Sequence, residues 1–393
     1  MLDLSRALQR LHTTDRLRRR PALVAGVTVT SSAASTHAGN RSAALTVVGA
    51  GGNIGSFLLP HLARDPAVGR ITLIDPDEYE EKNIAGQDIT AADIGRSKVK
   101  VRRERLLDIN PELAIIAIAD TAQSVPPGRL KADVILSALD SRRARLEVGR
   151  IAWCLNTPFL DAGVHTQESL VRIDLYIPSP DAACVECGMS RQAYAALEQV
   201  YPCRGAASVA PTNGTSSLGA LAASLLAIEC SKLLSGRLDT SLAGRQLIID
   251  LKHHTHFVTS FRRNPACRFN HEHWRLISAP SPAMLSIADV LTIADLGRDV
   301  HLRAIGHKFV HQVVCSTCGW LRKDLHLTGR SRRRRCSCGD RMSAAGFHMS
   351  DTLDCARAAT GLSRRLDRLG FIDGDVVAVE SETSVRHLQL GGC

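Results

Sequence analysis

Aromatic residues are scarce in this sequence: they make up 4% of its 393 residues, although 45% of the residues are hydrophobic. The core must therefore be built mainly from Ala, Val, Ile and Leu. No uninterrupted apolar run reaches the roughly 20 residues that a membrane-spanning helix needs. A secretory signal is also missing, because residues 1–20 mix acidic and basic side chains without an apolar stretch. These absences predict a soluble, cytoplasmic protein that binds no membrane.

The net charge is +10, with 49 Lys and Arg residues against 39 Asp and Glu residues. Much of the excess lies in two arginine-rich stretches, residues 16–20 and 330–335, outside the regularly patterned part of the chain. Solvated arginine loops, a nucleotide or an acidic protein partner would each explain this balance. Nucleic acid is therefore not expected as a partner.

The hydrophobic pattern divides the chain into four parts. Residues 1–40 lack periodicity and are expected to form a partly disordered arm. Residues 41–275 alternate buried strands with helices, which predicts an α/β domain with a doubly wound, Rossmann-like, mainly parallel sheet. Residues 276–308 are weakly patterned and are expected to be a linker. Residues 309–393 predict a small zinc-ribbon and αβ domain.

A glycine-rich turn follows the first strand of the α/β region, in the string LTVVGAGGNIGS. Backbone amides of such a turn, at the start of a helix, can bind phosphate. The glycines are Gly49, Gly51, Gly52 and Gly55. Asp75 ends the second strand, where an acidic side chain can bind ribose hydroxyls. This combination predicts nucleotide binding, but it fits an NAD-dependent dehydrogenase nearly as well as an ATP site.

Three strings beyond the turn separate those possibilities: LIDPDEYEEKNIAGQDI, then GRSKVK, then LSALDSRRAR. In order and approximate spacing they resemble the ThiF/MoeB/HesA family and the adenylation domains of ubiquitin-activating enzymes. The resemblance covers residues 44–275, more than half of the chain. It implies a homodimeric adenylyltransferase that uses ATP and Mg²⁺. Its substrate would be the C-terminal glycine of a ubiquitin-like or sulfur-carrier protein that ends in diglycine, and pyrophosphate would be released.

The resemblance also implies roles for individual residues. Asp75 would bind the ribose, and Asp77 would lie near the phosphates. Lys98 matches the family's phosphate-binding lysine, and Asp140 matches its magnesium-binding aspartate. Two polar residues after the second strand match the family as well, namely Asn83 and Gln87. Because a carboxylate must attack a phosphate of like charge, the reaction needs the screening that Lys98 and Mg²⁺ would supply.

Several of these residues have simpler interpretations. Lys98 could be an exposed lysine on an amphipathic helix, and Asp140 could cap the helix that begins at Ser141. Arg145 matches an arginine common in the family, but a structural ion pair would explain it equally well. Taken together, in this order along the chain, the residues favour an adenylation site.

The chain departs from the family pattern in three places. The turn GAGGNIG is one residue longer than the usual GxGGLG. Gly86 stands where the family often has a phosphate-binding arginine, so one positive charge must come from elsewhere. The N-terminal RYxRQ stretch, which can lend an arginine to a neighbouring subunit, is missing. Its arginine could be replaced by Arg18, Arg19 or Arg20.

The chain has twelve cysteines and no export signal, which points to reduced thiols and suggests metal ligands before disulfides. Cys184 and Cys187 form a CxxC turn, which in the family pairs with a second CxxC downstream. This chain has Cys267 and His271 at that place, and the four together would form a closed, tetrahedral zinc site. His273 lies nearby, so the identity of the fourth ligand stays open.

A second cysteine cluster is local in the sequence. Its members lie within 24 residues, as CxxC followed by CxC, and they are Cys315, Cys318, Cys336 and Cys338. This spacing is typical of a zinc ribbon. A Zn²⁺ ion there would fold a small module that lacks a sufficient core of its own.

Cys203 lies in the segment VYPCRGAASVAPTNG, a region in which some relatives carry an acceptor cysteine. A thiolate there could take the activated carboxylate from the adenylate, as a thioester or an acyl persulfide. The simpler interpretation is an unreactive loop thiol. Cys154 and Cys230 lie on apolar helical faces and are expected in the core.

Two other functions compete with adenylation. An NAD-dependent oxidoreductase would use the same glycine turn, although no His/Asp or Tyr/Lys pair for hydride transfer is evident. A non-catalytic scaffold with an activating-enzyme-like fold would explain Gly86 and the altered N-terminus. Lys98 and Asp140 argue against a scaffold, because a site without turnover does not need them.

Overall fold

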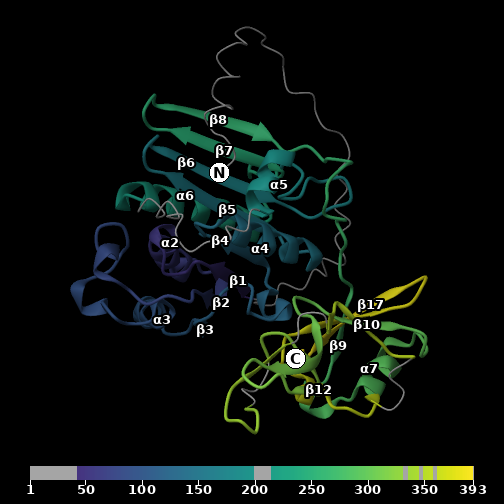
Figure 1. The fold of residues 1–393 in the computed structure, drawn as a ribbon. Helices are drawn as coiled ribbons and strands as arrows, with labels where there is room; N and C mark the ends of the chain where they lie inside the picture. Colours follow the sequence, from purple (N-terminus) through teal and green to yellow (C-terminus); the bar gives the residue numbers. More distant parts are fainter. Residues whose placement is uncertain (1–41, 199–213, 331–334, 345–347, 357–360, 393) are drawn as a thin grey trace.

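The computed structural model describes residues 42–198, 214–330, 335–344, 348–356 and 361–392. A larger region is built on one long sheet, and a smaller C-terminal region lies below it in the view of Figure 1. The larger region contains the strands and helices expected between residues 41 and 275.

Eight strands form the larger sheet, in the order β3-β2-β1-β4-β5-β6-β7-β8. The strands from β3 to β5 run parallel, and β6, β7 and β8 extend the sheet with antiparallel pairs. This arrangement confirms the predicted Rossmann-like, mainly parallel α/β fold. The strand order reverses at β1, so the carboxyl ends of β1 and β4 form the switch point at which such sheets bind ligands. The strands are β1 (Ala43–Val48), β2 (Val68–Ile74), β3 (Ala114–Ile118), β4 (Val134–Ser137), β5 (Phe159–His165), β6 (Leu170–Tyr176), β7 (Arg245–Asp250) and β8 (Thr255–Ser260).

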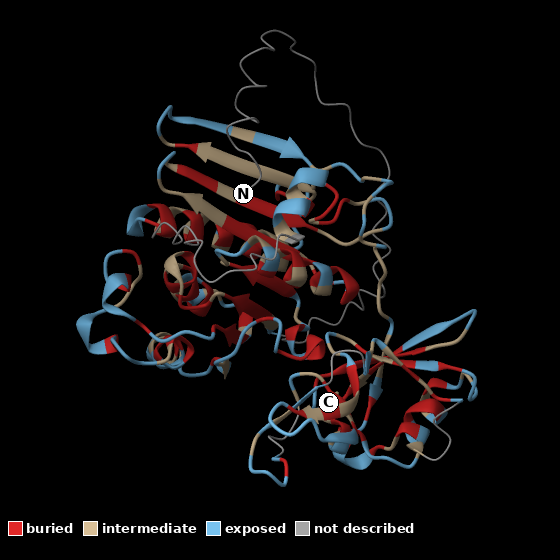
Figure 2. Ribbon diagram, in the orientation of Figure 1, coloured by how far each residue is buried: buried red, intermediate tan, exposed pale blue. Residues whose placement is uncertain are grey.

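Helices cover both faces of this sheet. On one face, α2, α3 and α6 contribute Leu58, Leu106 and Leu226 to the main core. On the other face, α4 contributes Val148 and Ala152 to a second core. The central strands are buried and the edge strand β8 is exposed (Figure 2). The helices are α2 (Asn53–Arg64), α3 (Lys98–Ile109), α4 (Arg142–Cys154), α5 (Arg191–Glu198) and α6 (Ser216–Leu234).

Helix α6 is long and apolar enough, by length and composition alone, to cross a membrane. It packs against α2, β5 and β6, and its buried side chains belong to the main core. Glu229 and Lys232 interrupt its apolar sequence. Because the core helix of a domain passes the same test, α6 is weak evidence for a membrane span.

The C-terminal region contains two smaller sheets. One has the order β15-β10-β16-β17-β9, and in the other β11 pairs with β12, β13 and β14. A separate core, which includes Phe309, Val377 and Leu388, lies between these elements. They are β9 (Leu276–Ala279), α7 (Ile287–Ala294), β10 (His301–Ala304), β11 (Phe309–Cys315), β12 (Leu321–Leu327), β13 (Met342–Ala344), β14 (Met349–Ser350), β15 (Thr352–Asp354), α8 (Leu366–Leu369), β16 (Val376–Glu380) and β17 (Val385–Leu390).

Residues 276–308 differ from the expected linker, because they form part of the C-terminal region. β9 pairs in parallel with β17, and β10 lies between β15 and β16. α7 begins in a capping box, in which the side chain of Ser286 accepts a hydrogen bond from Asp289 N and the side chain of Asp289 accepts one from Ser286 N. The two strands have four residues each, which is too short for a clear alternating pattern in the sequence.

Direct contacts join the two regions. Gly128 N donates a hydrogen bond of 2.9 Å to Gly374 O. A Cβ on Gly128 would lie 2.7 Å from that oxygen, so the approach requires glycine. Beside it, Arg129 Nε donates to Asp373 O at 3.0 Å. The regions therefore share a hydrogen-bonded boundary as well as a chain connection.

Candidate functional site

The glycine turn lies at the switch point of the larger sheet. Gly49 has a φ of +80°, and a Cβ there would lie 2.7 Å from Ala138 O in the loop after β4. A Cβ on Gly55 would lie 2.2 Å from Gly49 O, so helix and turn also pack too closely for a side chain. Gly52 is the N-cap of α2 and provides no capping side chain. The first amides of α2 are therefore left for a ligand, as in other phosphate-binding turns.

Lys98 lies directly over this turn. It is the first residue of α3, and it is only 6% exposed. A Cβ on Gly51 would lie 2.4 Å from Lys98 Cβ, so the glycine leaves the space that the lysine stem occupies. Lys98 Nζ lies 2.9 Å from Asp77 Oδ2. The interpretation of Lys98 as an exposed surface lysine is therefore wrong.

Asp75 is buried at the end of β2, beside the same turn. Its Oδ2 accepts from Gly51 N at 2.9 Å, and its Oδ1 accepts from Asp77 N at 3.1 Å. Burial raises the pKa of Asp75, and the nearby Lys98 ammonium opposes that shift. One oxygen thus holds the glycine turn, and the other holds the segment that follows β2. Each carboxylate oxygen has a second lone pair that a ribose hydroxyl can use.

The two amide residues lie in the crossover between β2 and α3. Asn83 is buried, and its Oδ1 accepts from Glu80 N at 2.9 Å, which caps the short 3₁₀ turn Glu81–Asn83. Gln87 Oε1 is buried and has no hydrogen-bond partner among the described residues. The structure thus gives Asn83 a local role in the backbone, whereas the Gln87 oxygen has bonding capacity left for a ligand.

Gly86 is enclosed by neighbouring backbone. A Cβ there would lie 2.6 Å from Gly214 O, so an arginine at this position would not fit. Asn53 Nδ2 bridges the two segments by donating to Gly86 O and, at 3.0 Å, to Gly214 O. Sequence reasoning misses Asn53, and only its place directly after the glycine turn could have indicated it.

Asp140 is exposed in the loop between β4 and α4. The N-cap of α4 is Ser141, whose hydroxyl accepts from Ala144 N at 3.4 Å. The alternative in which Asp140 caps this helix is therefore wrong.

Arg145 Nη1 lies 2.7 Å from Asp161 Oδ2, so the structural ion pair considered for Arg145 is present.

Arg102 fixes the crossover segment, and sequence reasoning misses it. It is 1% exposed, and its Nε donates to the Tyr79 hydroxyl at 2.8 Å. Its Nη1 donates to Ser56 O and to Asp88 Oδ2, both at 3.2 Å. Burial raises the pKa of Tyr79 to about 12, so this hydroxyl stays protonated. The sequence contains one indication that Arg102 lies near the site: it follows Lys98 by four residues, which places both side chains on one face of α3.

Four potential metal ligands converge beside β6 and β8, and they are Cys184, Cys187, Cys267 and His271. Cys184 Sγ lies 3.8 Å from both other sulfurs, and Cys187 Sγ lies 3.3 Å from His271 Nε2. Tetrahedral zinc with bonds of about 2.3 Å places two sulfurs about 3.8 Å apart. His273 stacks on a tryptophan of α4 instead and lies outside the group. The set therefore fits Zn²⁺ with the ligands expected from the sequence.

The second cysteine cluster is also assembled, and its members are Cys315, Cys318, Cys336 and Cys338. Cys315 Sγ lies 3.5 Å from Cys338 Sγ, and Cys318 Sγ lies 3.5 Å from Cys336 Sγ. Four thiols at such distances fit one tetrahedral Zn²⁺ ion. They tie the end of β11 to the segment before β13.

The remaining cysteines include the two expected in the core and the candidate acceptor. Cys154 and Cys230 are buried, as expected, and burial raises the pKa of each thiol to about 12. Both are therefore unreactive thiols at neutral pH. Cys203 lies outside the described residues, as do Arg18–Arg20.

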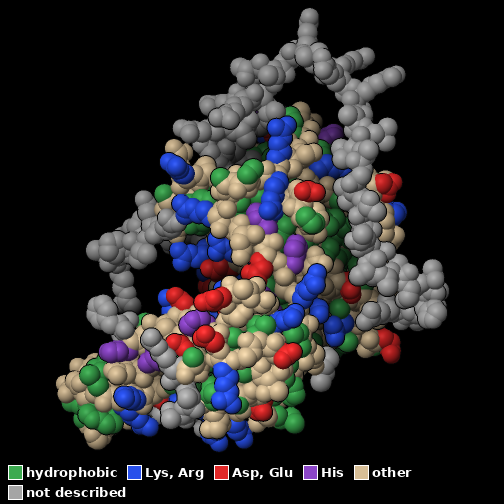
Figure 3. Space-filling model, turned by 90° about the vertical axis from the view of Figure 1, so that its right-hand side faces the viewer, with side chains coloured by type: hydrophobic (Ala, Val, Ile, Leu, Met, Phe, Trp, Pro, Cys, Tyr) green, Lys and Arg blue, Asp and Glu red, His purple; other side chains and the backbone are tan. Residues whose placement is uncertain are grey.

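Surface charge gives no sign of an extended basic face in the view of Figure 3. Lys and Arg side chains there are interspersed with Asp and Glu side chains.

These features define a Rossmann-like α/β protein with a phosphate-binding type of turn, a buried lysine over that turn and two cysteine-rich clusters. A match to the ThiF family spans residues 37–269. Because the match covers more than half of the chain, the protein belongs to the ThiF family.

Individual relatives are similar over the same region. The sulfur carrier protein ThiS adenylyltransferase of Escherichia coli K12 is 28% identical over 224 residues, which is 56% of this chain and 83% of that protein. The probable adenylyltransferase/sulfurtransferase MoeZ of Mycobacterium tuberculosis is 28% identical over 232 residues, 58% of this chain and 56% of that protein. The crystal structure of E. coli MccB with ATP has a TM-score of 0.47 at 21% identity. It covers 58% of this chain and 65% of that one.

Proposed function

We propose that the protein binds ATP at the carboxyl edge of the larger sheet and adenylates the C-terminal glycine of a diglycine-tailed protein of the ubiquitin-like or sulfur-carrier type. The observation that carries the proposal is the position of Lys98, buried over the glycine turn between Asp75 and Asp77. The family relationship and relatives named as adenylyltransferases support it.

The proposed chemistry follows from charge and position. The substrate carboxylate attacks the α-phosphorus, the bond from that phosphorus to the bridging oxygen breaks, and pyrophosphate leaves. The amides of the glycine turn and Lys98 hold the phosphates, while Asp75 holds the ribose. Because both reactants are anions, Lys98 lowers the repulsion between them. Asp140, exposed beside the turn, would hold Mg²⁺, which supplies further screening of phosphate charge.

The metal clusters and domains complete the proposal. Zn²⁺ would bind each cysteine-rich cluster as a structural ion, since four protein ligands leave no open position for catalysis. Residues 41–275 would form the adenylation domain, and the region from residue 309 would carry the zinc ribbon.

A later step concerns Cys203. Its thiolate would attack the acyl-adenylate, a thioester bond would form and AMP would leave. A covalent adduct that survives denaturation and still forms in Cys203→Ala would contradict this role, because alanine has no nucleophile to hold the acyl group. The cytoplasm, where thiols stay reduced, is the proposed location, and cell fractionation tests it.

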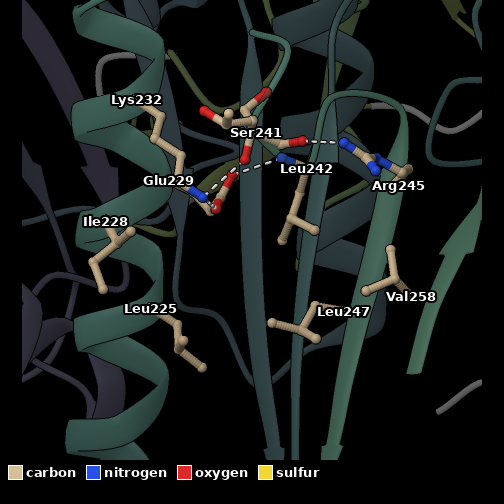
Figure 4. Close-up of a pocket in the computed structure, with 10 residues that line it drawn as sticks. Leu225, Ile228, Glu229, Lys232, Ser241, Leu242, Arg245, Leu247 and Val258 are labelled. Carbon is tan, nitrogen blue, oxygen red and sulfur yellow. Dashed lines mark hydrogen bonds and ion pairs between the residues drawn. The ribbon is translucent and has the colours of Figure 1, made fainter. Parts of the chain in front are cut away.

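The proposed assembly is a homodimer. An apolar groove of about 290 Å³ lies between α6 and the β7–β8 edge (Figure 4). Ile228 and Val258 line it and are 52% and 48% exposed. Large apolar side chains grouped in this way mark interaction surfaces, and a second copy of the chain would cover them. Sedimentation equilibrium tests this, because Ile228→Asp should shift a dimer to monomers.

ATP–pyrophosphate exchange tests the function. Exchange should depend on a diglycine-tailed carrier protein and should fall about 100-fold or more in Asp140→Ala. Asp108→Ala removes an exposed carboxylate from α3 and should leave exchange unchanged. The proposal is wrong if the wild type shows no exchange with any such carrier, or if it binds NAD more tightly than ATP–Mg²⁺ in a titration.

A further inference from the structure

Two arginines share one buried carboxylate beside the end of β4. Arg145 Nη1, from α4, lies 2.7 Å from Asp161 Oδ2, and Arg172 Nη2, from β6, lies 2.6 Å from the same oxygen. Arg172 also forms an ion pair with Asp174. Asp161 and Asp174 are 2% and 1% exposed. The two guanidinium groups are therefore fixed in place.

The strand between these arginines is adapted to them. A Cβ on Gly163, in β5, would lie 3.0 Å from Arg145 Nη1 and 3.4 Å from Arg172 Nη2. Glycine therefore gives the two guanidinium groups their space above the sheet. A larger side chain would displace at least one of them.

A third arginine in the cluster has bonding capacity left. Arg142 is the first residue of α4, and its buried Nη2 has no hydrogen-bond partner among the described residues. Arg142 and Arg145 are three residues apart on α4, so their side chains share one face of the helix. Burial lowers the pKa of Arg142, and repulsion from Arg172 and Arg145 lowers it further. Arg145 and Arg172 are paired with the buried carboxylates of Asp161 and Asp174, and the charge of Asp140 also acts on Arg145. The buried Nη2 of Arg142 has no such partner among the described residues. Burying a charge without a partner is unfavourable, which makes this cluster a ready site for an anion.

The cluster adjoins the glycine turn. Arg145 Nη2 donates to Leu139 O, and a Cβ on Gly49 would lie 3.4 Å from Leu139 N. Lys98 packs against Gly51, on the side of the turn that faces β2. The turn therefore has a lysine on one side and the arginine cluster on the other.

The position that carries an arginine in many relatives is closed here, because Gly86 lies against Gly214 O. We propose that Arg142, beside Arg145 and Arg172, supplies that positive charge by binding an oxyanion of the adenylation reaction. The oxyanion is the α-phosphate of the nucleotide or the carboxylate that attacks it. This inference rests on the proposed function.

The three arginines have different parts in this site. Arg145 and Arg172 already bind Asp161, so they position the cluster and set its charge. Arg142 has the unpartnered donor and makes the contact with the anion. A charge-assisted contact of this kind contributes about 10- to 100-fold to affinity.

Calorimetric titration of the full chain tests the inference with ATP–Mg²⁺, AMP and adenosine as probes. A short peptide ending in Gly-Gly, as the free acid and as the C-terminal amide, is titrated in the presence of a non-hydrolysable ATP analogue. The variants are Arg142→Gln and the charge-preserving Arg142→Lys. Arg143→Gln is the matched control, because Arg143 is the exposed neighbour and its Nη2 donates to Leu197 O. Thermal unfolding confirms that each variant folds.

If Arg142 binds the α-phosphate, Arg142→Gln weakens ATP and AMP about 10- to 100-fold and leaves adenosine unchanged. If it binds the attacking carboxylate, nucleotide affinities stay the same, and the free acid loses its advantage over the amide. In both cases Arg142→Lys recovers part of the loss, and Arg143→Gln behaves as the wild type. If Arg142→Gln binds nucleotides and peptides as tightly as the wild type, this inference is wrong. The proposed function is not affected by that result, because the wild type still binds ATP. A wild type that does not bind ATP–Mg²⁺ overturns the proposed function, and this inference with it.

Discussion

Two basic residues one helical turn apart on α3 have different surroundings. Lys98 lies over the glycine turn and pairs with the exposed Asp77. Arg102 is enclosed by the crossover segment and by Tyr79. A ligand can therefore compete for the Lys98 ammonium, whereas Arg102 acts on the backbone that shapes the site.

Replacing Lys98 with alanine should slow ATP–pyrophosphate exchange by about 100- to 1,000-fold, because a buried positive group beside the phosphates is lost. Lys100→Ala is the matched control, since Lys100 is the exposed neighbour on the same helix. The measurement is the exchange rate at saturating carrier protein. Equal rates in Lys98→Ala and Lys100→Ala would mean that Lys98 has no part in the reaction.

Residues of the site differ in how far the sequence predicts them. The glycine turn is readable because its conformation is local and only glycine adopts it without strain. Lys98 and Asp140 are placed by resemblance, since their spacing along the chain says nothing about burial. Arg172 gives no signal at all, because its partner Asp161 belongs to another strand.

At the scale of elements, the two cysteine clusters join different kinds of segment. The first ties the loop after β6 to the segment after β8, so it closes the antiparallel end of the larger sheet. The second ties the end of β11 to the segment before β13. The ligand spacing is visible in the sequence in both cases. The choice of His271 over His273 depends on how the segment packs against α4.

Metal analysis of the purified chain should find about two zinc ions per molecule, as two closed tetrahedral sites require. Cys184→Ser and Cys336→Ser should each lose about one ion and lower the unfolding temperature. Cys154→Ser is the control, because Cys154 is a buried thiol outside both clusters. A zinc content that neither ligand variant changes would contradict both sites.

At the scale of the whole molecule, a cleft of about 490 Å³ lies between the two regions. Ser124 and Arg129 line it from the larger region, and His307 and Arg330 line it from the C-terminal region. Arg330 Nη2 donates to Ser124 O at 3.3 Å. The boundary therefore contains ionisable groups, and His307 is one of them.

His307 should make the folded protein less stable in mild acid. Burial lowers its pKa, and the Arg330 charge adds to that shift, so the folded state favours the neutral ring. The stabilisation is complete above the unfolded pKa of about 6.5. It is lost as the pH falls from there through the folded pKa, because the unfolded chain takes up the proton first.

Unfolding free energies at several pH values between 7.5 and 5 measure this effect. His307→Gln should lose less stability than the wild type across that interval. His301→Gln, which changes an exposed histidine of β10, should follow the wild-type curve. Since acid weakens zinc ligands equally in all three proteins, the difference between the curves isolates His307. Parallel curves for the wild type and His307→Gln would contradict the prediction.

The sequence by itself determined the features that depend on neighbouring residues: the strand–turn–helix at Gly49, the parallel α/β pattern and the two sets of cysteine spacings. Such features are local, because backbone conformation and short spacings are set within a few residues. Only the tertiary structure decided that residues 276–308 join the C-terminal region, since β9 finds its partner in β17 at the far end of the described chain. It alone also decided the arginine cluster, which draws Arg142, Arg145 and Arg172 from a helix and a strand. The physical reason is that long-range pairing and burial depend on how elements pack, and spacing along the chain does not encode that packing.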